Sequence, residues 1–113
     1  MTSQKVVKIF RDDSGKEPFI IWIKSLKDPT TKARIQQRIR RMEMGNFGDH
    51  KSIGHGVWEL KIDFGPGYRV YFAEEGQKIV ILLCDGDKKT QQHDIEQAQH
   101  YWKHYKGDNN VKI

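Results

Sequence analysis

The stretch Trp58–Phe72, "WELKIDFGPGYRVYF", decides the fold, because apolar and polar residues alternate on both sides of a central "FGPG". Alternation with a period of two is typical of strands with one buried face, and a short Gly/Pro segment is typical of the turn between them. The sequence therefore predicts a β-hairpin. Its inward side carries Trp58, Leu60, Ile62, Tyr68, Val70 and Phe72, and its outward side carries Glu59, Lys61, Asp63, Arg69 and Tyr71.

The other elements follow from their own patterns. We expect strands at 5–10, 58–63, 68–72 and from 78 onward, helices at 18–26, 28–45 and 91–106, a loop at 45–56, and a frayed tail at about 107–113. The continuous apolar run "IVILLC" indicates a central strand covered on both faces. The predicted order is β-α-α-β-β-β-α, an α+β fold in a single domain over 1–113.

The register of the hairpin determines which outward side chains meet. The expected cross-strand pairs are Leu60 with Phe72, Ile62 with Val70, Lys61 with Tyr71, and Asp63 with Arg69. This arrangement would gather several cations on one surface of the sheet.

The composition is that of a small basic protein. The chain has 113 residues, a formal net charge of +5 and a pI near 9.4. Such a charge favours nucleic acid or an acidic protein segment as partner, although a basic protein with neither is equally compatible with charge alone. The single cysteine, Cys84, excludes an internal disulfide and indicates a reducing compartment. With no bilayer-spanning apolar run and no signal-peptide core, we expect a cytoplasmic protein without membrane contact.

The helix predicted at 28–45 carries a row of arginines beside its buried stripe. Arg34, Arg38 and Arg41 follow helical spacing, and no acidic residue lies among them. The row is either a ridge that faces phosphates or a partner protein, or simply a solvated helix face.

The outward cations of the hairpin suit the chemistry of a phosphodiester. Lys61 and Arg69, with Lys88 and Lys89 at the end of the next strand, could stabilise the charge that develops on phosphate oxygens during attack. RNA supplies its own nucleophile, the 2′-hydroxyl, so such a site needs no metal or other cofactor. The alternative is a structural role for these charges, with Asp63 paired to Arg69 and Glu59 paired to a lysine.

Histidines offer further candidates. His93, His100 and His104 lie on one face of the last helix, where a zinc site is the less favoured alternative because no cysteine pair accompanies them. His93, or His55 just before the hairpin, could act as a general acid, since histidine titrates near neutrality.

Two segments resemble the RelE/ParE toxin superfamily of bacterial toxin–antitoxin modules, in particular its HigB-like branch of addiction module killer proteins. They are "GVWELKIDFGPGYRVYF" at 56–72 and "IVILLCDGDKKTQQHDIEQAQHYW" at 79–102. The resemblance covers roughly 5–105. It implies a RelE-like fold, in which an antiparallel sheet packs on an N-terminal helical hairpin. It also implies a toxin that a cognate antitoxin neutralises and that cuts mRNA in the ribosomal A site through 2′-hydroxyl attack.

The resemblance also implies roles for individual residues. Arg69 matches the arginine that stabilises the phosphate, Lys61 matches a basic residue of the preceding strand, and Lys88 or Lys89 matches the basic residue after the last strand. The predicted catalytic set is Lys61, Arg69, Lys88, Lys89 and His93, and the predicted RNA- and ribosome-binding set is Arg34, Arg38, Arg41, His55 and Tyr71.

Two departures from the RelE pattern keep other functions open. Glu59 stands where that pattern often has a basic residue, and Gln91, Gln92 and His93 stand where RelE has a catalytic tyrosine. The alternatives are a ParE-like poison of DNA gyrase and a degenerate, non-toxic module that only binds the antitoxin.

Overall fold

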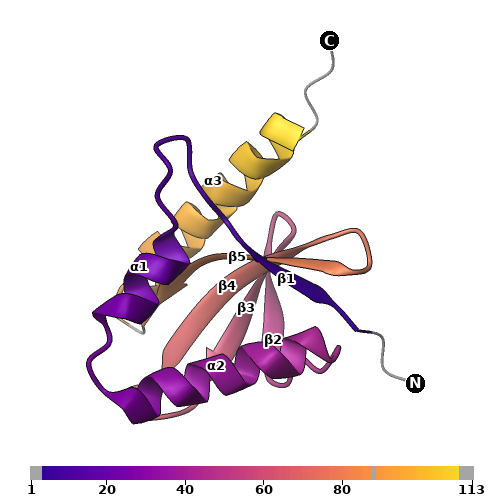
Figure 1. Ribbon diagram of the computed structural model, residues 1–113. Helices are drawn as coiled ribbons and strands as arrows, with labels where there is room; N and C mark the ends of the chain where they lie inside the picture. Colours follow the sequence, from indigo (N-terminus) through magenta and orange to yellow (C-terminus); the bar gives the residue numbers. More distant parts are fainter. Residues whose placement is uncertain (1–3, 88, 110–113) are drawn as a thin grey trace.

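A five-stranded sheet with helices on both faces forms the protein (Figure 1). The computed structural model describes residues 4–87 and 89–109. Its elements are β1 (Val6–Ile9), α1 (Pro18–Ser25), α2 (Pro29–Glu43), β2 (His50–Gly54), β3 (Val57–Ile62), β4 (Tyr68–Glu75), β5 (Ile79–Gly86) and α3 (Gln91–Asn109). The α+β class is confirmed, and the two N-terminal helices begin where the sequence indicated.

The sheet is mixed, with strand order β1-β5-β4-β3-β2. The four strands from β2 to β5 are antiparallel to their neighbours, whereas β1 runs parallel to β5. The expected purely antiparallel sheet is therefore wrong. The chain leaves β1, forms α1 and α2 on one face, and returns to the sheet elsewhere, so β1 can lie parallel to β5 at the edge.

The strand β2 lies inside the predicted loop at 45–56, so that prediction is wrong for His50–Gly54. Its residues are mostly exposed and pair with β3 through backbone contacts, from His50 opposite Leu60 to Gly54 opposite Val57. An edge strand with both faces largely solvated shows no alternation of apolar residues, so its pattern resembles that of a loop.

The central hairpin forms, but its register differs from the prediction. Leu60 pairs with Val70 rather than Phe72, which shifts the pairing by two positions, and Lys61 lies opposite Arg69. The cause is the turn: the Phe64 amide donates to the Ile62 carbonyl at 3.1 Å, so Asp63 and the "FGPG" segment all belong to the connection. A shift of two keeps every side chain on its predicted face.

Two hydrophobic clusters cover the two faces of the sheet. The cluster beneath α1 and α2 includes Ile35, Leu60, Val70, Phe72 and Leu82, and the cluster beneath α3 includes Val57, Tyr71, Ile81, Leu83 and Trp102. From Val80 to Leu83, consecutive residues of β5 belong to different clusters, which confirms the central strand covered on both faces.

The ends of two helices follow local chemistry. Asp28, the first residue of the helix predicted at 28–45, accepts a hydrogen bond from the Thr30 amide at 3.2 Å and so caps α2. The last helix, α3, continues to Asn109, so the predicted tail is wrong for 107–109, and 110–113 lie outside the described residues. Within 4–87 and 89–109, no helix is long and apolar enough to cross a membrane.

Candidate functional site

Three strand ends and the start of α3 meet at one edge of the sheet. Lys61 on β3 lies opposite Arg69 on β4, and Arg69 in turn lies opposite Gly86, the last residue of β5. The chain then reaches α3 through Asp87, Lys89 and Thr90, with Lys88 outside the described residues. The structure thus brings together Lys61, Arg69 and the segment that carries Lys89.

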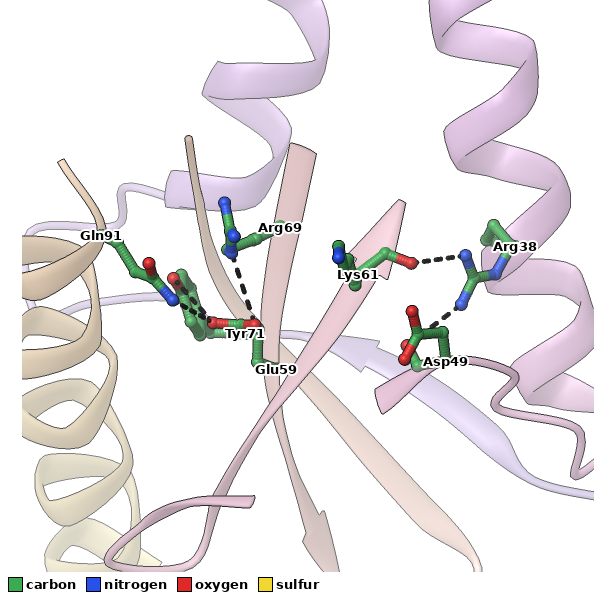
Figure 2. Close-up of polar contacts among 7 residues, drawn as sticks. All are labelled: Arg38, Asp49, Glu59, Lys61, Arg69, Tyr71 and Gln91. Carbon is green, nitrogen blue, oxygen red and sulfur yellow. Dashed lines mark hydrogen bonds and ion pairs between the residues drawn. The ribbon is translucent and has the colours of Figure 1, made fainter. Parts of the chain in front are cut away.

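A buried carboxylate, Glu59, organises this edge (Figure 2). The residue is 2% exposed, and its Oε2 accepts a hydrogen bond from Gln91 Nε2 at 3.0 Å. Its Oε1 lies 3.4 Å from Arg69 Nε, and the Tyr71 hydroxyl lies 3.5 Å from Oε2. Glu59 therefore links β3, β4 and the first turn of α3.

The Glu59 carboxylate contacts Arg69 at Nε and leaves the two terminal nitrogens of the guanidinium unbound. The residue is 9% exposed, and its Nε is buried without a hydrogen bond of acceptable geometry. Figure 2 shows the remainder of its guanidinium extending away from Glu59. Among the described residues, the terminal nitrogens have no hydrogen-bond partner, so two donors of the guanidinium fork remain available for an anion.

The start of α3 is fixed by its own acidic residue. The Asp87 carboxylate accepts hydrogen bonds from the amides of Lys89 at 2.9 Å and Thr90 at 3.1 Å. These bonds, first that from Thr90, lower the pKa of Asp87. Because Asp87 fixes where α3 begins, it also places Gln91 against Glu59.

The three arginines of the row on α2 have different surroundings. Arg38 donates to the carbonyl of Lys61 at 2.6 Å, so it ties α2 to β3 (Figure 2). Arg38 also donates to the Phe47 carbonyl at 3.1 Å. Arg34 stacks over Phe64 with 4.7 Å to the ring centroid, and Arg41 is exposed. Arg38 thus has a structural role, whereas Arg34 and Arg41 remain on the surface.

Two predicted site residues lie elsewhere than expected. Tyr71 is fully buried beneath α3, so its predicted contact with RNA is wrong. Burial, and then the charge of Glu59, raise the pKa of this phenol. His93 is exposed, but two helical positions separate it from Gln91 by about 200° around α3, so it faces away from Glu59 and Arg69.

Arg69 and Glu59 do form a structural ion pair, as the alternative interpretation of the outward charges expected, but the predicted partners of both residues are wrong. Arg69 pairs with Glu59, whereas Asp63 is exposed in the turn and makes no ion pair with any described residue. The sequence placed Glu59 on the right face, but nothing in the local pattern showed that α3 would cover that part of the face.

The family comparison matches a large part of the chain that includes this site. The family model described as "Phage derived protein Gp49-like (DUF891)" matches residues 22–105. The chain belongs to the Gp49-like family. The predicted membership of the RelE/ParE superfamily is therefore wrong, because the matching family model is a different one. The "GPGYRVYF" hairpin and the segment into α3 are features of this Gp49-like chain rather than proof of that superfamily.

Most of the chain is also similar to a bacterial protein. The Gp49-like chain is 52% identical over 81 residues to an uncharacterized protein of Haemophilus influenzae, which covers 72% of this chain and 82% of that protein.

The edge of the Gp49-like sheet can bind an anion such as a phosphate. Arg69 offers two donors in a fixed fork, and Lys61 adds a flexible ammonium from the neighbouring strand. Glu59 is too buried, and too fully engaged with Arg69 and Gln91, to take a proton from a substrate. Glu59 therefore positions Arg69.

A second carboxylate near this edge leads to a pH prediction. Burial, and secondarily the charges of Asp94 and Asp87, raise the pKa of Asp85 to about 7. Its folded pKa thus lies above its unfolded value, so the folded state binds more protons between about pH 4 and 7. Stability should therefore fall as the pH rises through this window.

Asp85→Asn should remove this pH dependence and raise the free energy of unfolding at pH 8 by roughly 1–2 kcal/mol. The shift of about three units corresponds to about 4 kcal/mol, which partial solvation reduces. Urea unfolding at pH 5 and pH 8 measures the effect, with the exposed Asp63→Asn as matched control. An equal pH dependence in wild type and Asp85→Asn would contradict the prediction.

Proposed function

We propose that this Gp49-like protein is the toxin of a toxin–antitoxin module and an endoribonuclease that cleaves mRNA on the ribosome. The family is one often related to toxin–antitoxin systems, which supports the cellular role. The observation that carries the chemistry is the Lys61–Arg69 pair, in which buried Glu59 fixes Arg69 and leaves two guanidinium donors unused.

In the proposed reaction, the ribose 2′-hydroxyl of the substrate attacks the adjacent phosphorus. The new bond forms a 2′,3′-cyclic phosphate, and the bond to the 5′-oxygen breaks with its electron pair. One proton leaves the 2′-hydroxyl and one reaches the departing 5′-oxygen, so the step needs no other reactant. Arg69 stabilises the charge on the phosphate oxygens, and Lys61 contributes charge or proton transfer from the neighbouring strand. Lys89, which is exposed just before α3, is a further cation for the same step.

The proposed partners follow from the same reading. The net charge of +5 and the exposed Arg34 and Arg41 suit ribosomal RNA, where phosphate contacts supply affinity without reading sequence. A cognate antitoxin would neutralise the toxin, and charge complementarity would speed its association. Action on ribosomes would place the protein in the cytoplasm.

Induced expression in bacterial cells tests the proposed function. We expect incorporation of labelled methionine to stop well before incorporation of labelled thymidine, because translation is the proposed target. Co-expression of the protein encoded beside the toxin gene should restore growth if it is the antitoxin. Early loss of thymidine incorporation with intact translation would refute the proposal in favour of a gyrase poison, and unimpaired growth would refute a toxin altogether.

A further inference from the structure

A second basic surface lies along α3, away from the Lys61–Arg69 pair. It is a groove of about 550 Å³ between the turn that joins β2 to β3 and the later part of α3. Its lining residues are His55, Glu96, Gln99, His100, Lys103 and Lys106. The predicted RNA-binding set included His55 but none of the α3 residues.

Two contacts tie α3 to the β2–β3 hairpin between the Glu59–Arg69 pair and the groove. Gln91 donates to Glu59 on β3, and Gln99 donates to the Ile53 carbonyl on β2 at 2.9 Å. The two positions are about 12 Å apart along α3 and about 80° apart around it. The part of α3 that lies beside the hairpin therefore extends from the Glu59–Arg69 pair to the groove.

The turn that carries His55 is pressed against α3. A Cβ at Gly56 would meet the Trp102 indole Nε1 at 2.8 Å, so a residue larger than glycine requires the indole or the turn to shift. His55 has φ +57°, and among the described residues it is the non-glycine residue with positive φ. Histidine, like asparagine and aspartate, is enriched at such positions, so the turn accepts a histidine at the rim of the groove.

The charges in the groove are available to a ligand. Lys103 and Lys106 are exposed, and neither forms an ion pair within the part of the chain that the structure describes. The Lys106 ammonium lies over the Trp102 ring, 5.5 Å from its centroid. Glu96, the acid of the groove, already accepts a hydrogen bond from Gln92 at 3.1 Å.

We propose that this groove binds the phosphate backbone of single-stranded RNA on one side of the cleaved phosphate. The inference rests on the proposed function and adds to it a length requirement for the substrate. From Gln91 to Lys103, α3 rises about 18 Å, a distance that two adjacent phosphates of a single strand cannot span. RNA is favoured over an acidic protein segment because one strand could contact both the groove and Arg69.

The experiment measures binding apart from cleavage, with fluorescein-labelled 2′-O-methyl RNA, which lacks the attacking hydroxyl. For a 12-nucleotide RNA, Lys103→Ala/Lys106→Ala should weaken binding by roughly 20-fold at 0.1 M salt and lower the salt slope by about 1.4. Binding of a 3-nucleotide RNA should not change. The matched control is Lys24→Ala/Lys27→Ala, two exposed lysines outside the groove, and Lys103→Gln/Lys106→Gln serves as a second variant.

Several outcomes separate this inference from the proposed function. Unchanged 12-nucleotide binding in both groove variants, or equal losses for both RNA lengths, would overturn the groove. Loss of binding to the antitoxin with unchanged RNA binding would also overturn it, in favour of a protein-docking surface. Length-dependent binding that requires the two lysines, in a protein that never arrests translation, would support the groove while refuting the cleavage function.

Discussion

Replacing Arg69 by lysine is expected to abolish growth arrest and to slow RNA cleavage by a factor of about 100–1,000. Lysine keeps a positive charge beside Glu59, but it lacks the planar fork whose two terminal nitrogens extend away from that carboxylate. The loss should therefore fall on the chemistry rather than on the fold. Growth after induction and cleavage of mRNA by the purified protein with ribosomes measure it.

The matched control is Arg11→Lys, which changes an exposed arginine paired with Glu17. We expect Arg11→Lys to arrest growth like the wild type, and we expect both variants to unfold at nearly the wild-type denaturant concentration. Arg69→Ala is less informative, because it leaves the Glu59 carboxylate buried without its cation. Full growth arrest by a folded Arg69→Lys protein would show that the guanidinium is not required.

Removal of Glu59 is expected to cost about 3–5 kcal/mol of unfolding free energy, because it leaves the buried Arg69 charge uncompensated. Glu59→Ala also removes the acceptor of Gln91 and so loosens the start of α3. Urea unfolding measures the loss. The matched control is Glu17→Ala at the surface pair with Arg11, where we expect at most about 1 kcal/mol.

A double-mutant cycle distinguishes a lost ion pair from a simple cavity. Glu59→Ala combined with Arg69→Met should be less destabilised than the sum of the two single variants, because neither charge is then left alone. If the destabilisation of the double variant equals the sum of the two single variants within about 0.5 kcal/mol, the two residues are not coupled. Glu59 would then no longer explain the position of Arg69.

The sequence carries the strong local signals of this fold. The alternation of Leu60 and Ile62 with polar residues, and the Asp28–Pro29 start of α2, each depend on neighbours within a few positions. For the same reason, the helix at 91–106 could be predicted, and its Ala98 and Trp102, one helical turn apart, are buried.

The features that the sequence did not predict depend on contacts between distant parts of the chain. The edge strand β2 pairs with β3 through its backbone, and most of its side chains are exposed, so its sequence shows little apolar alternation. The sequence showed that Glu59, Arg69 and Tyr71 share a face, but not that α3 covers Glu59 and Tyr71 while Lys61 stays exposed. The sequence therefore predicted which face of the sheet carries the candidate site, but it did not predict the ion pair between Glu59 and Arg69.

The ends of the cleaved RNA test the central claim most directly. Purified protein, ribosomes and a defined mRNA would be incubated together, and the new 3′ ends would be analysed for a 2′,3′-cyclic phosphate. We predict cyclic phosphate and matching 5′-hydroxyl ends with the wild type and with Arg11→Lys, and intact mRNA with Arg69→Lys. Intact mRNA with the wild-type protein, or identical cleavage by Arg69→Lys, would contradict a cleavage site built on Lys61, Arg69 and Glu59.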